Sequence, residues 1–390
     1  MASVISTARA NLEYARSLPY PPGWSNDYGR WREITDEMYA DIPSLTTPIE
    51  VLRYAQAGKY FDHRVKSVDS LWSTLWCNLI ETEFPWFIED VLTMSDDPDS
   101  RPETIGTIGK FDLLVSNIYF WHLRSILNIC TYVGKPYVVL EIGGGYGAFA
   151  RLFCMGSLSP AKYFIVDIPE SLFFAECCLT KSFPGEVGYW RGEDPGTKFV
   201  LVPIQNLDTF CVGADVVINI GSMQEMSEHW VGAFMGWLDL LPTRHFYSLN
   251  YACQPLAKMG ESRNYWAPRP GQLWVSKILN FDPVLTRTMT ANRGWLEALY
   301  ERGAQPPRTM ESWAVNRGFS LTRQTYLEGL DLLRVNWSKE NAEAFLTTLN
   351  NTPYLGLKES YFVAKSFEKE GELFSELCKT LEGLTGGYER

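Results

Sequence analysis

Val138-Val-Leu-Glu-Ile-Gly-Gly-Gly-Tyr-Gly-Ala-Phe-Ala150 is the stretch of the sequence that decides the fold. An apolar run of strand length leads directly into Gly143, Gly144, Gly145 and Gly147, and the residues that follow predict a helix. Glycine permits positive φ angles and lets a ligand touch the backbone, while the first turn of a helix offers free amide donors. The stretch therefore predicts a strand–loop–helix unit that binds a cofactor.

Two classes of cofactor are bound by loops of this kind. Gly143, Gly145 and Ala148 satisfy the G-x-G-x-x-G/A pattern of dinucleotide-binding loops. S-adenosylmethionine is the other class, and Glu141, two residues before the first glycine, favours it. A carboxylate there attracts the cationic amino group of a methionine moiety, whereas beside a pyrophosphate it is repulsive by about 1 kcal/mol or more. An NAD-dependent oxidoreductase is the alternative interpretation of the loop.

The next predicted strand, 163–167, ends in a second carboxylate, Asp167. A carboxylate at the end of this strand can accept hydrogen bonds from both hydroxyls of a ribose. The alternative is that Asp167 caps the helix predicted from Pro169 onward. Both roles fit the same position in the sequence.

Short apolar runs alternate with segments of helical length between residues 137 and 250. This alternation predicts a parallel sheet covered on both faces, with ligands bound beyond the carboxyl ends of the strands. The expected strands are 137–142, 163–167, 199–204, 216–220 and 245–250, and the expected helices are 111–132, 149–155, 169–183 and 223–240. Weaker patterns predict late strands over 320–327 and 361–367 and late helices over 339–349 and 368–384.

The first 110 residues have a different character. They are mostly helical and irregular in pattern, rich in Trp and Phe, and they contain no glycine loop and no set of nucleophilic side chains. The acidic, proline-containing segment 95–103 follows as a loop or boundary. We therefore expect a helical N-terminal extension over 1–110, acting as a lid or as the dimer element of a homodimer, and a cofactor-binding domain over 111–390.

Charge and composition exclude several classes of function. The 390 residues carry a formal net charge of -11, which repels phosphate backbones and predicts that the partner is not a nucleic acid. No apolar run reaches about 18 residues and no signal peptide is recognisable, so we expect a cytoplasmic protein without a membrane span. The eight cysteines form no C-x-x-C pair, and no carboxylate pair follows a strand, so we expect no metal site.

Three stretches resemble the class I S-adenosylmethionine-dependent methyltransferases. They are VVLEIGGGYGAFARLF (138–153), YFIVDIPESL (163–172) and ADVVINIGSMQEMSE (214–228). More narrowly, EIGGGYG, VDIPE and SMQEM are similar to the bacterial sugar O-methyltransferases. The resemblance implies an α/β fold with a Rossmann-like seven-stranded sheet, helices on both faces and an antiparallel last strand. It also implies S-adenosylmethionine as the cofactor.

The resemblance further implies which residues contact the cofactor. Asp167 would meet the ribose, and Ile168 would pack against adenine. The contact to the adenine amine stays open between Gln205, Asn206 and Asp208, because the usual Gly-Asp pair is missing there. The complete expected set is Glu141, Gly143, Gly145, Gly147, Asp167, Ile168, Asn206 and Ser222.

Methyl transfer to an alcohol requires an aligned acceptor oxygen and a base that takes its proton. Glu225 and His229 are four residues apart on the predicted helix 223–240, so they would share one face. Glu225 could then orient a neutral His229 that accepts the proton, although a solvated Glu–His pair is the alternative. Tyr251 is the third candidate for a catalytic role.

Four residues are candidates for binding the acceptor. Gln224 and Asn250 follow strands and offer hydrogen bonds, while Arg263 and Trp266 offer a guanidinium group and a ring for stacking on a sugar. The sequence thus predicts an O-methyltransferase that acts on a hydroxyl of a sugar or sugar-bearing small molecule. A catalytically silent methyltransferase-like binding protein is the alternative from a different class.

Overall fold

A computed structural model describes most of the N-terminal two thirds of the chain and parts of the rest. The described residues are 2–24, 31–56, 85–94, 97, 99, 117–251, 274–281, 295–302, 338, 340, 341 and 344. They belong to two compact units, of which the first comprises Met1–Asn26 and Trp31–Ile218 and the second Asp27–Arg30 and Asn219–Arg390. The predicted boundary at residue 110, the late strands, and most of the late helices lie outside the described residues.

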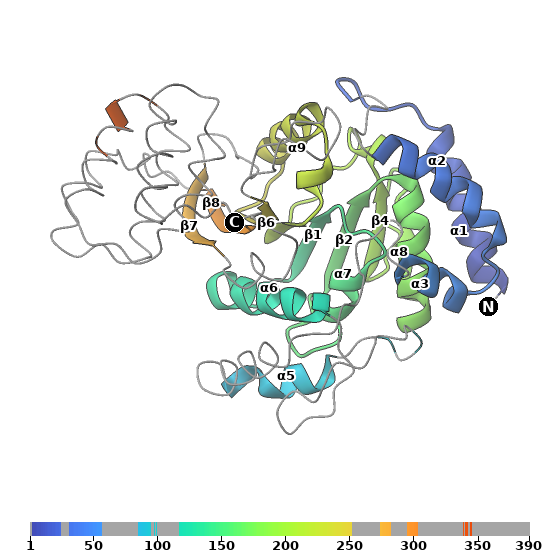
Figure 1. Cartoon of the computed structure of the whole chain (residues 1–390), viewed down its shortest axis with the longest axis horizontal. Coiled ribbons are helices and arrows are strands. Elements are labelled where there is room, and N and C mark those ends of the chain that lie inside the picture. The colour runs from blue at the N-terminus through green and yellow to red at the C-terminus, as the bar shows by residue number, and fades with distance from the viewer. Residues whose placement is uncertain are drawn as a thin grey trace, which may run out of the picture. The chain divides into compact units, whose positions relative to one another are not determined.

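Parallel strands form the centre of the first unit (Figure 1). Their bounds are β1 Val138–Ile142, β2 Lys162–Asp167, β3 Val187–Tyr189, β4 Phe199–Pro203 and β5 Val216–Ile220. They are hydrogen-bonded in the order β3-β4-β2-β1-β5. β1, β2 and β4 are buried along nearly their whole length, which explains why they stand out in the sequence as continuous apolar runs.

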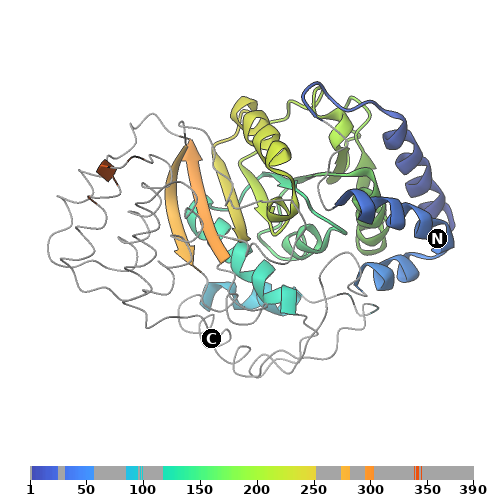
Figure 2. The ribbon, with the colours of Figure 1, turned by 45° about the horizontal axis from the view of Figure 1, so that its top comes forward.

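An antiparallel arrangement ends the sheet in the second unit. β6 is His245–Tyr251, β7 is Trp274–Phe281 and β8 is Trp295–Arg302. β8 lies between β6 and β7 and runs antiparallel to both, as the yellow and orange arrows of Figure 2 show. The order of the described strands is β3-β4-β2-β1-β5-β6-β8-β7, and β8, the last of them along the chain, is antiparallel to both of its neighbours. This confirms the predicted mostly parallel sheet with an antiparallel strand, with the short edge strand β3 as an eighth member.

The helices between residues 117 and 240 agree with the prediction except at one point. α6 is Asn117–Val133, α7 is Ala148–Phe153 and α8 is Pro169–Ser182. The prediction of one helix over 223–240 is wrong, because the segment forms a 3₁₀ turn, η5 (Met223–Glu225), and a separate helix, α9 (Glu228–Leu240). Met226 between them is extended, and the Ser227 side chain caps α9 by accepting a hydrogen bond from Trp230 N at 3.3 Å.

The N-terminal extension is helical, as predicted, and packs on α8. Its helices are α1 Ala2–Ser17, α2 Trp31–Asp41, α3 Pro48–Gln56 and α5 Ile88–Thr93, and Figure 1 shows α1 and α3 beside α8. Leu12 and Val51 belong to one hydrophobic cluster with Phe174 of α8 and with Tyr146 of the glycine loop. The extension therefore shares its core with the loop that the sequence analysis singled out.

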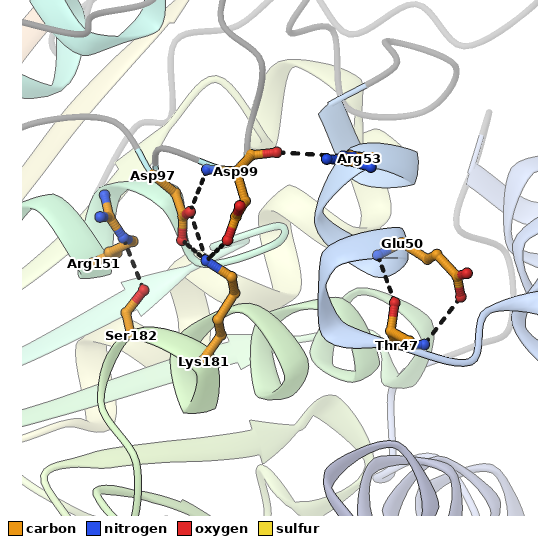
Figure 3. A network of polar contacts seen from close by, with 8 residues as sticks. All are labelled: Thr47, Glu50, Arg53, Asp97, Asp99, Arg151, Lys181 and Ser182. Carbon is orange, nitrogen blue, oxygen red and sulfur yellow. Dashed lines mark hydrogen bonds and ion pairs between the residues drawn. The ribbon is translucent and has the colours of Figure 1, made fainter. Parts of the chain in front are cut away.

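The acidic segment 95–103 is anchored where it is described. Lys181, near the end of α8, forms ion pairs with Asp97 Oδ1 (2.6 Å) and Asp99 Oδ2 (2.8 Å). Arg53 Nε of α3 donates to the carbonyl oxygen of Asp99 at 3.5 Å, so this network joins α3, the acidic segment and α8 (Figure 3). Within the described part of the chain, no helix is both long and apolar enough to cross a membrane.

Candidate cofactor-binding site

The loop after β1 adopts a backbone conformation that favours glycine at three positions. The φ angles are 74° at Gly143, 57° at Gly145 and 81° at Gly147. Gly143 N donates to Val166 O of β2 at 2.8 Å, and Gly147 N donates to Gly144 O at 2.9 Å. The loop therefore turns sharply while it stays bonded to the neighbouring strand.

Gly144 is required for a different reason, which is lack of space. A Cβ atom at this position would lie 2.7 Å from Ile165 Cγ2 and 3.1 Å from Glu141 Oε2. The first distance is well inside van der Waals contact, and Ile165 is fully buried in β2. Sequence reasoning missed this requirement, although the uninterrupted run of three glycines was its visible signal.

Glu141 is a buried carboxyl group that lies beside the glycine loop. Its side chain is 3% exposed, and Oε2 accepts a hydrogen bond from Tyr163 OH of β2 at 3.0 Å. Burial raises the pKa of Glu141 to about 8, against the lowering effect of the Tyr163 hydrogen bond, and the charge of Asp167 raises it further. Without a ligand, Glu141 therefore holds a proton at neutral pH that a nearby cation would displace.

Asp167 ends β2 and clamps the loop. Its Oδ2 accepts a hydrogen bond from Gly145 N at 2.8 Å, and its Oδ1 accepts one from Ile168 N at 2.7 Å. Burial raises the pKa of Asp167 to about 7, although these two backbone donors and the Ser171 side chain oppose the shift. The N-cap of α8 is Ile168, and no side chain caps that helix. Asp167 thus binds the loop and, with its remaining lone pairs, can accept hydrogen bonds from a ribose.

The turn after β4 brings two amide side chains to the same edge of the sheet, because Pro203 is paired in register with Asp167. Asn206 is buried, and its Nδ2 donates to Trp190 O at 3.1 Å. Gln205 is 6% exposed, and its Oε1 has no hydrogen-bond partner. Of the three candidates for the adenine amine, Gln205 therefore presents the unused buried acceptor, while Asp208 is exposed.

The predicted residues of the second unit form a network of their own. Asn250 Nδ2 donates to Asn219 Oδ1 (2.8 Å) and to Ser248 Oγ (2.9 Å), and Asn250 Oδ1 accepts from Gln224 N (3.3 Å). Ser222 Oγ accepts from Asn219 Nδ2 at 2.5 Å. Asn250 is fully buried and its side chain is already used, so it holds the turn after β5 against β6. The roles of Gln224 and Asn250 in acceptor binding and of Ser222 in cofactor binding stay predictions.

The predicted Glu225–His229 pairing requires both residues to lie on one face of one helix, and they do not. Glu225 ends the turn η5 and His229 lies in the first turn of α9, so the two do not share a helix face. The break occurs because Ser227 starts a new helix between them. His229 is exposed and Glu225 is partly buried. The catalytic roles of His229, Glu225 and Tyr251 stay predictions.

Two predicted acceptor contacts, Arg263 and Trp266, lie outside the described residues. Among the residues that are described, no group of three or more His, Cys, Asp or Glu side chains is arranged to hold a metal ion.

Comparisons with known proteins give low similarity. No family model and no curated protein matches the chain. Among solved structures, an rRNA methylase from Escherichia coli is 11% identical, with 76% of this chain and 100% of that chain covered and a TM-score of 0.31. TrmK of M. capricolum, solved with S-adenosyl-homocysteine, is 9% identical over 66% of this chain and 96% of that chain, with a TM-score of 0.32. The ribosomal protein L11 methylase of Lactobacillus delbrueckii subsp. bulgaricus is 16% identical, with 47% of this chain and 79% of that chain covered and a TM-score of 0.28.

Gly144→Ala should destabilise the protein by about 1–3 kcal/mol, because the added methyl group overlaps Ile165 in a packed core. Urea unfolding monitored by circular dichroism measures the change. Gly236→Ala is the matched control, since nothing lies within 4 Å of a Cβ at this position in α9. The control should raise the free energy of unfolding by about 0.5–1 kcal/mol. Equal effects of the two substitutions would contradict the steric explanation.

Glu141→Gln should stabilise the ligand-free protein at alkaline pH. The pKa of Glu141 is about 8 in the folded protein against an ordinary value of 4.5, so the folded protein keeps a proton that the unfolded chain loses. The free energy of unfolding of the wild type therefore decreases as pH rises through this window. Above pH 8 the free energy of unfolding of Glu141→Gln should exceed that of the wild type by on the order of 4 kcal/mol, because one pKa unit corresponds to about 1.4 kcal/mol.

The measurement is the free energy of unfolding of both proteins between pH 5 and about 9. Glu193→Gln is the control, since this exposed carboxylate is hydrated in the folded and the unfolded state. A constant difference between Glu141→Gln and the wild type over the whole range would show that Glu141 is charged in the folded protein.

Proposed function

We propose that the chain is an S-adenosylmethionine-dependent methyltransferase. The observation that carries the proposal is the Glu141 carboxyl group, buried and only 3.1 Å from the place where a Gly144 Cβ would lie. A cationic amino acid group would displace the proton of this acid and pair with the carboxylate, whereas the pyrophosphate of a dinucleotide offers no such cation. This preference for a cation supports S-adenosylmethionine over NAD for the same loop.

The residues of the first unit can each be given a role toward that cofactor. Glu141 pairs with the amino group, Asp167 accepts the ribose hydroxyls, Gln205 accepts the adenine amine, and Ile168 packs on the adenine ring. Asp167 is suited to its role because its carboxylate also accepts a hydrogen bond from Gly145 N. This bond keeps a constant distance between the glycine loop and the carboxylate that would accept from the ribose.

When bound, S-adenosylmethionine supplies a methyl group on a positively charged sulfur. The chain's contribution is to hold the acceptor oxygen in line with the bond that breaks and to accept its proton. His229, Glu225 and Tyr251 are the candidates for the proton acceptor.

For the acceptor we propose a hydroxyl of a sugar or of a sugar-bearing small molecule. The support is the similarity of EIGGGYG, VDIPE and SMQEM to bacterial sugar O-methyltransferases and the net charge of -11, which disfavours a polyanionic acceptor.

The affinity for S-adenosylhomocysteine, which keeps the amino group of the cofactor, should rise between pH 6 and 8. Glu141 must lose its proton to pair with the cation, so binding releases a proton near neutral pH and the affinity rises by up to about tenfold per pH unit. Glu141→Gln should bind about 10–100 times more weakly at pH 8, the range for a hydrogen bond to a charged group. Calorimetry in buffers of different ionisation enthalpy measures both the affinity and the protons released.

Glu193→Gln should behave as the wild type in this titration, because Glu193 is an exposed carboxylate in a surface loop. Tighter binding of NADH than of S-adenosylhomocysteine would overturn the proposed function. Affinity that does not change with pH in the wild type would overturn the role of Glu141.

Incubation with S-adenosylmethionine and a panel of sugars, glycosides and nucleotide sugars should yield a product heavier by one methyl group, detected by mass spectrometry. With the acceptor in hand, His229→Ala should lower turnover by about 10²–10⁴ and leave cofactor affinity unchanged if His229 is the base. Turnover close to that of the wild type would move the role to Glu225 or Tyr251. Methylation of a nucleic acid with no sugar in the panel accepted would contradict the proposed acceptor class.

A further inference from the structure

We propose that Tyr163 of β2 is a positioning residue for the amino group of the cofactor. In this proposal the Tyr163 hydroxyl occupies Oε2 of Glu141, and Oε1 is left as the oxygen that meets the cationic amino group. The inference rests on the proposed function, because it concerns the carboxyl group that would bind the methionine end of S-adenosylmethionine. It adds that a residue inside the sheet sets the pH at which the cofactor is bound.

The register of the sheet places Tyr163 within reach of Glu141. Tyr163 is paired with Val139, which lies two residues before Glu141 on β1. Residues two apart on a strand share a face, so Glu141 is the diagonal neighbour of Tyr163, within reach of an aromatic side chain. The Tyr163 hydroxyl spans this diagonal and donates to Glu141 Oε2 at 3.0 Å.

Packing holds the Tyr163 ring in this place. Tyr163 is fully buried, and its ring lies at 79° to the ring of Phe153 of α7, with the ring centres 6.4 Å apart. On β4, Phe199 is paired with Tyr163 in register, and these two ring centres are 6.2 Å apart. A ring enclosed in a packed core has little freedom to turn away, so its hydroxyl stays at Glu141.

The direction of this hydrogen bond follows from the charges of the two groups. Burial raises the pKa of the Tyr163 hydroxyl well above its ordinary value, and the charge of Glu141 raises it further, so the phenol keeps its hydrogen when Glu141 is ionised. An ionised carboxylate can only accept, and a neutral phenol has one hydrogen to donate. In the state that binds a cation, Tyr163 is therefore the donor and Oε2 the acceptor.

The other oxygen of the Glu141 carboxylate stays available for a ligand. Oε2 is enclosed by Tyr163 and by Gly144, since a Cβ at Gly144 would lie only 3.1 Å from it. Oε1 accepts no hydrogen bond from any residue that the structure describes. A cation that approaches the carboxylate from the glycine loop therefore meets Oε1.

The described groups that influence the charge of Glu141 include no cation. Tyr163 and Asp167 act on it from β2, and the charge of Asp167 raises the pKa of Glu141. Cys154, directly after α7, is also close enough to feel the charge of Glu141, but its thiol is neutral because burial raises its pKa to about 12. The hydrogen bond from Tyr163 lowers the pKa of Glu141, so it favours the charged form before a ligand arrives.

The test measures the affinities of the full-length protein for two ligands between pH 6 and about 9 by calorimetry. The ligands are S-adenosylhomocysteine and 5′-methylthioadenosine, which keeps the ribose and the adenine but lacks the amino group. Tyr163→Phe should weaken the binding of S-adenosylhomocysteine about tenfold at pH 7 and move its rise with pH upward by about one unit, the size of a hydrogen bond to a charged group. The affinity for 5′-methylthioadenosine should stay that of the wild type. In the Glu141→Gln background, Tyr163→Phe should change neither affinity further.

Tyr189→Phe is the matched control, because Tyr189 of β3 is a buried tyrosine whose hydroxyl has no hydrogen-bond partner within the described part of the chain. It should keep both affinities and their pH dependence. If Tyr163→Phe does not fold, 3-fluorotyrosine at position 163 offers a second measurement. Its more acidic hydroxyl is a stronger donor, so the rise in affinity should move to lower pH. Thermal unfolding shows which of these proteins are folded.

An unchanged pH dependence after either replacement of Tyr163 would overturn the positioning role and leave the proposed function intact. An equal loss of affinity for both ligands would also overturn it, because Tyr163 would then only maintain the shape of the site. A wild type that binds neither ligand would instead overturn the proposed function.

Discussion

The hydrogen bond from Gly145 N to Asp167 Oδ2, 2.8 Å long, connects the loop after the first strand with the end of the second, and the site depends on it. Parallel strands bring their carboxyl ends to one edge, but they do not by themselves hold the loops there. Asp167 does so with one carboxylate oxygen, and Gly143 adds a backbone bond to Val166. The loop can then leave its own backbone uncovered for a ligand, and glycine is what this conformation requires.

Buried carboxyl groups recur around this loop, and each lowers stability near neutral pH. Burial raises the pKa of Glu141 to about 8 and the pKa values of Asp167 and Glu176 to about 7. Glu176 is compensated, since Asn11 of α1 donates to both of its oxygens at 2.9 and 3.1 Å. Glu141 has Tyr163 as its donor and lies beside the loop, where a cation would stabilise its charged form. Groups that destabilise the free protein but favour a ligand are typical of functional sites.

The N-terminal extension is part of this site and not an independent domain. Tyr146 of the glycine loop is buried in the same cluster as Leu12, Val51 and Phe174. Glu176 and Glu170 on α8 are held by Asn11 and Arg16 of α1. Residues 169–179 of α8 are all buried, because α8 packs between the strands and the N-terminal helices.

The sequence alone determined the features that depend on neighbours along the chain. The sequence predicted the apolar runs of β1, β2, β4, β5 and β6, the glycine loop and the two strand-end carboxylates. The reason is that the spacing of apolar residues and the residue types of a turn are local properties of the chain. Tertiary structure alone decided the features set by distant partners. β8 is paired antiparallel with both β6 and β7, and Gly144 lacks space because Ile165 lies on another strand. Gln205 is buried with its Oε1 left without a hydrogen-bond partner, and no local pattern of the sequence contains that feature.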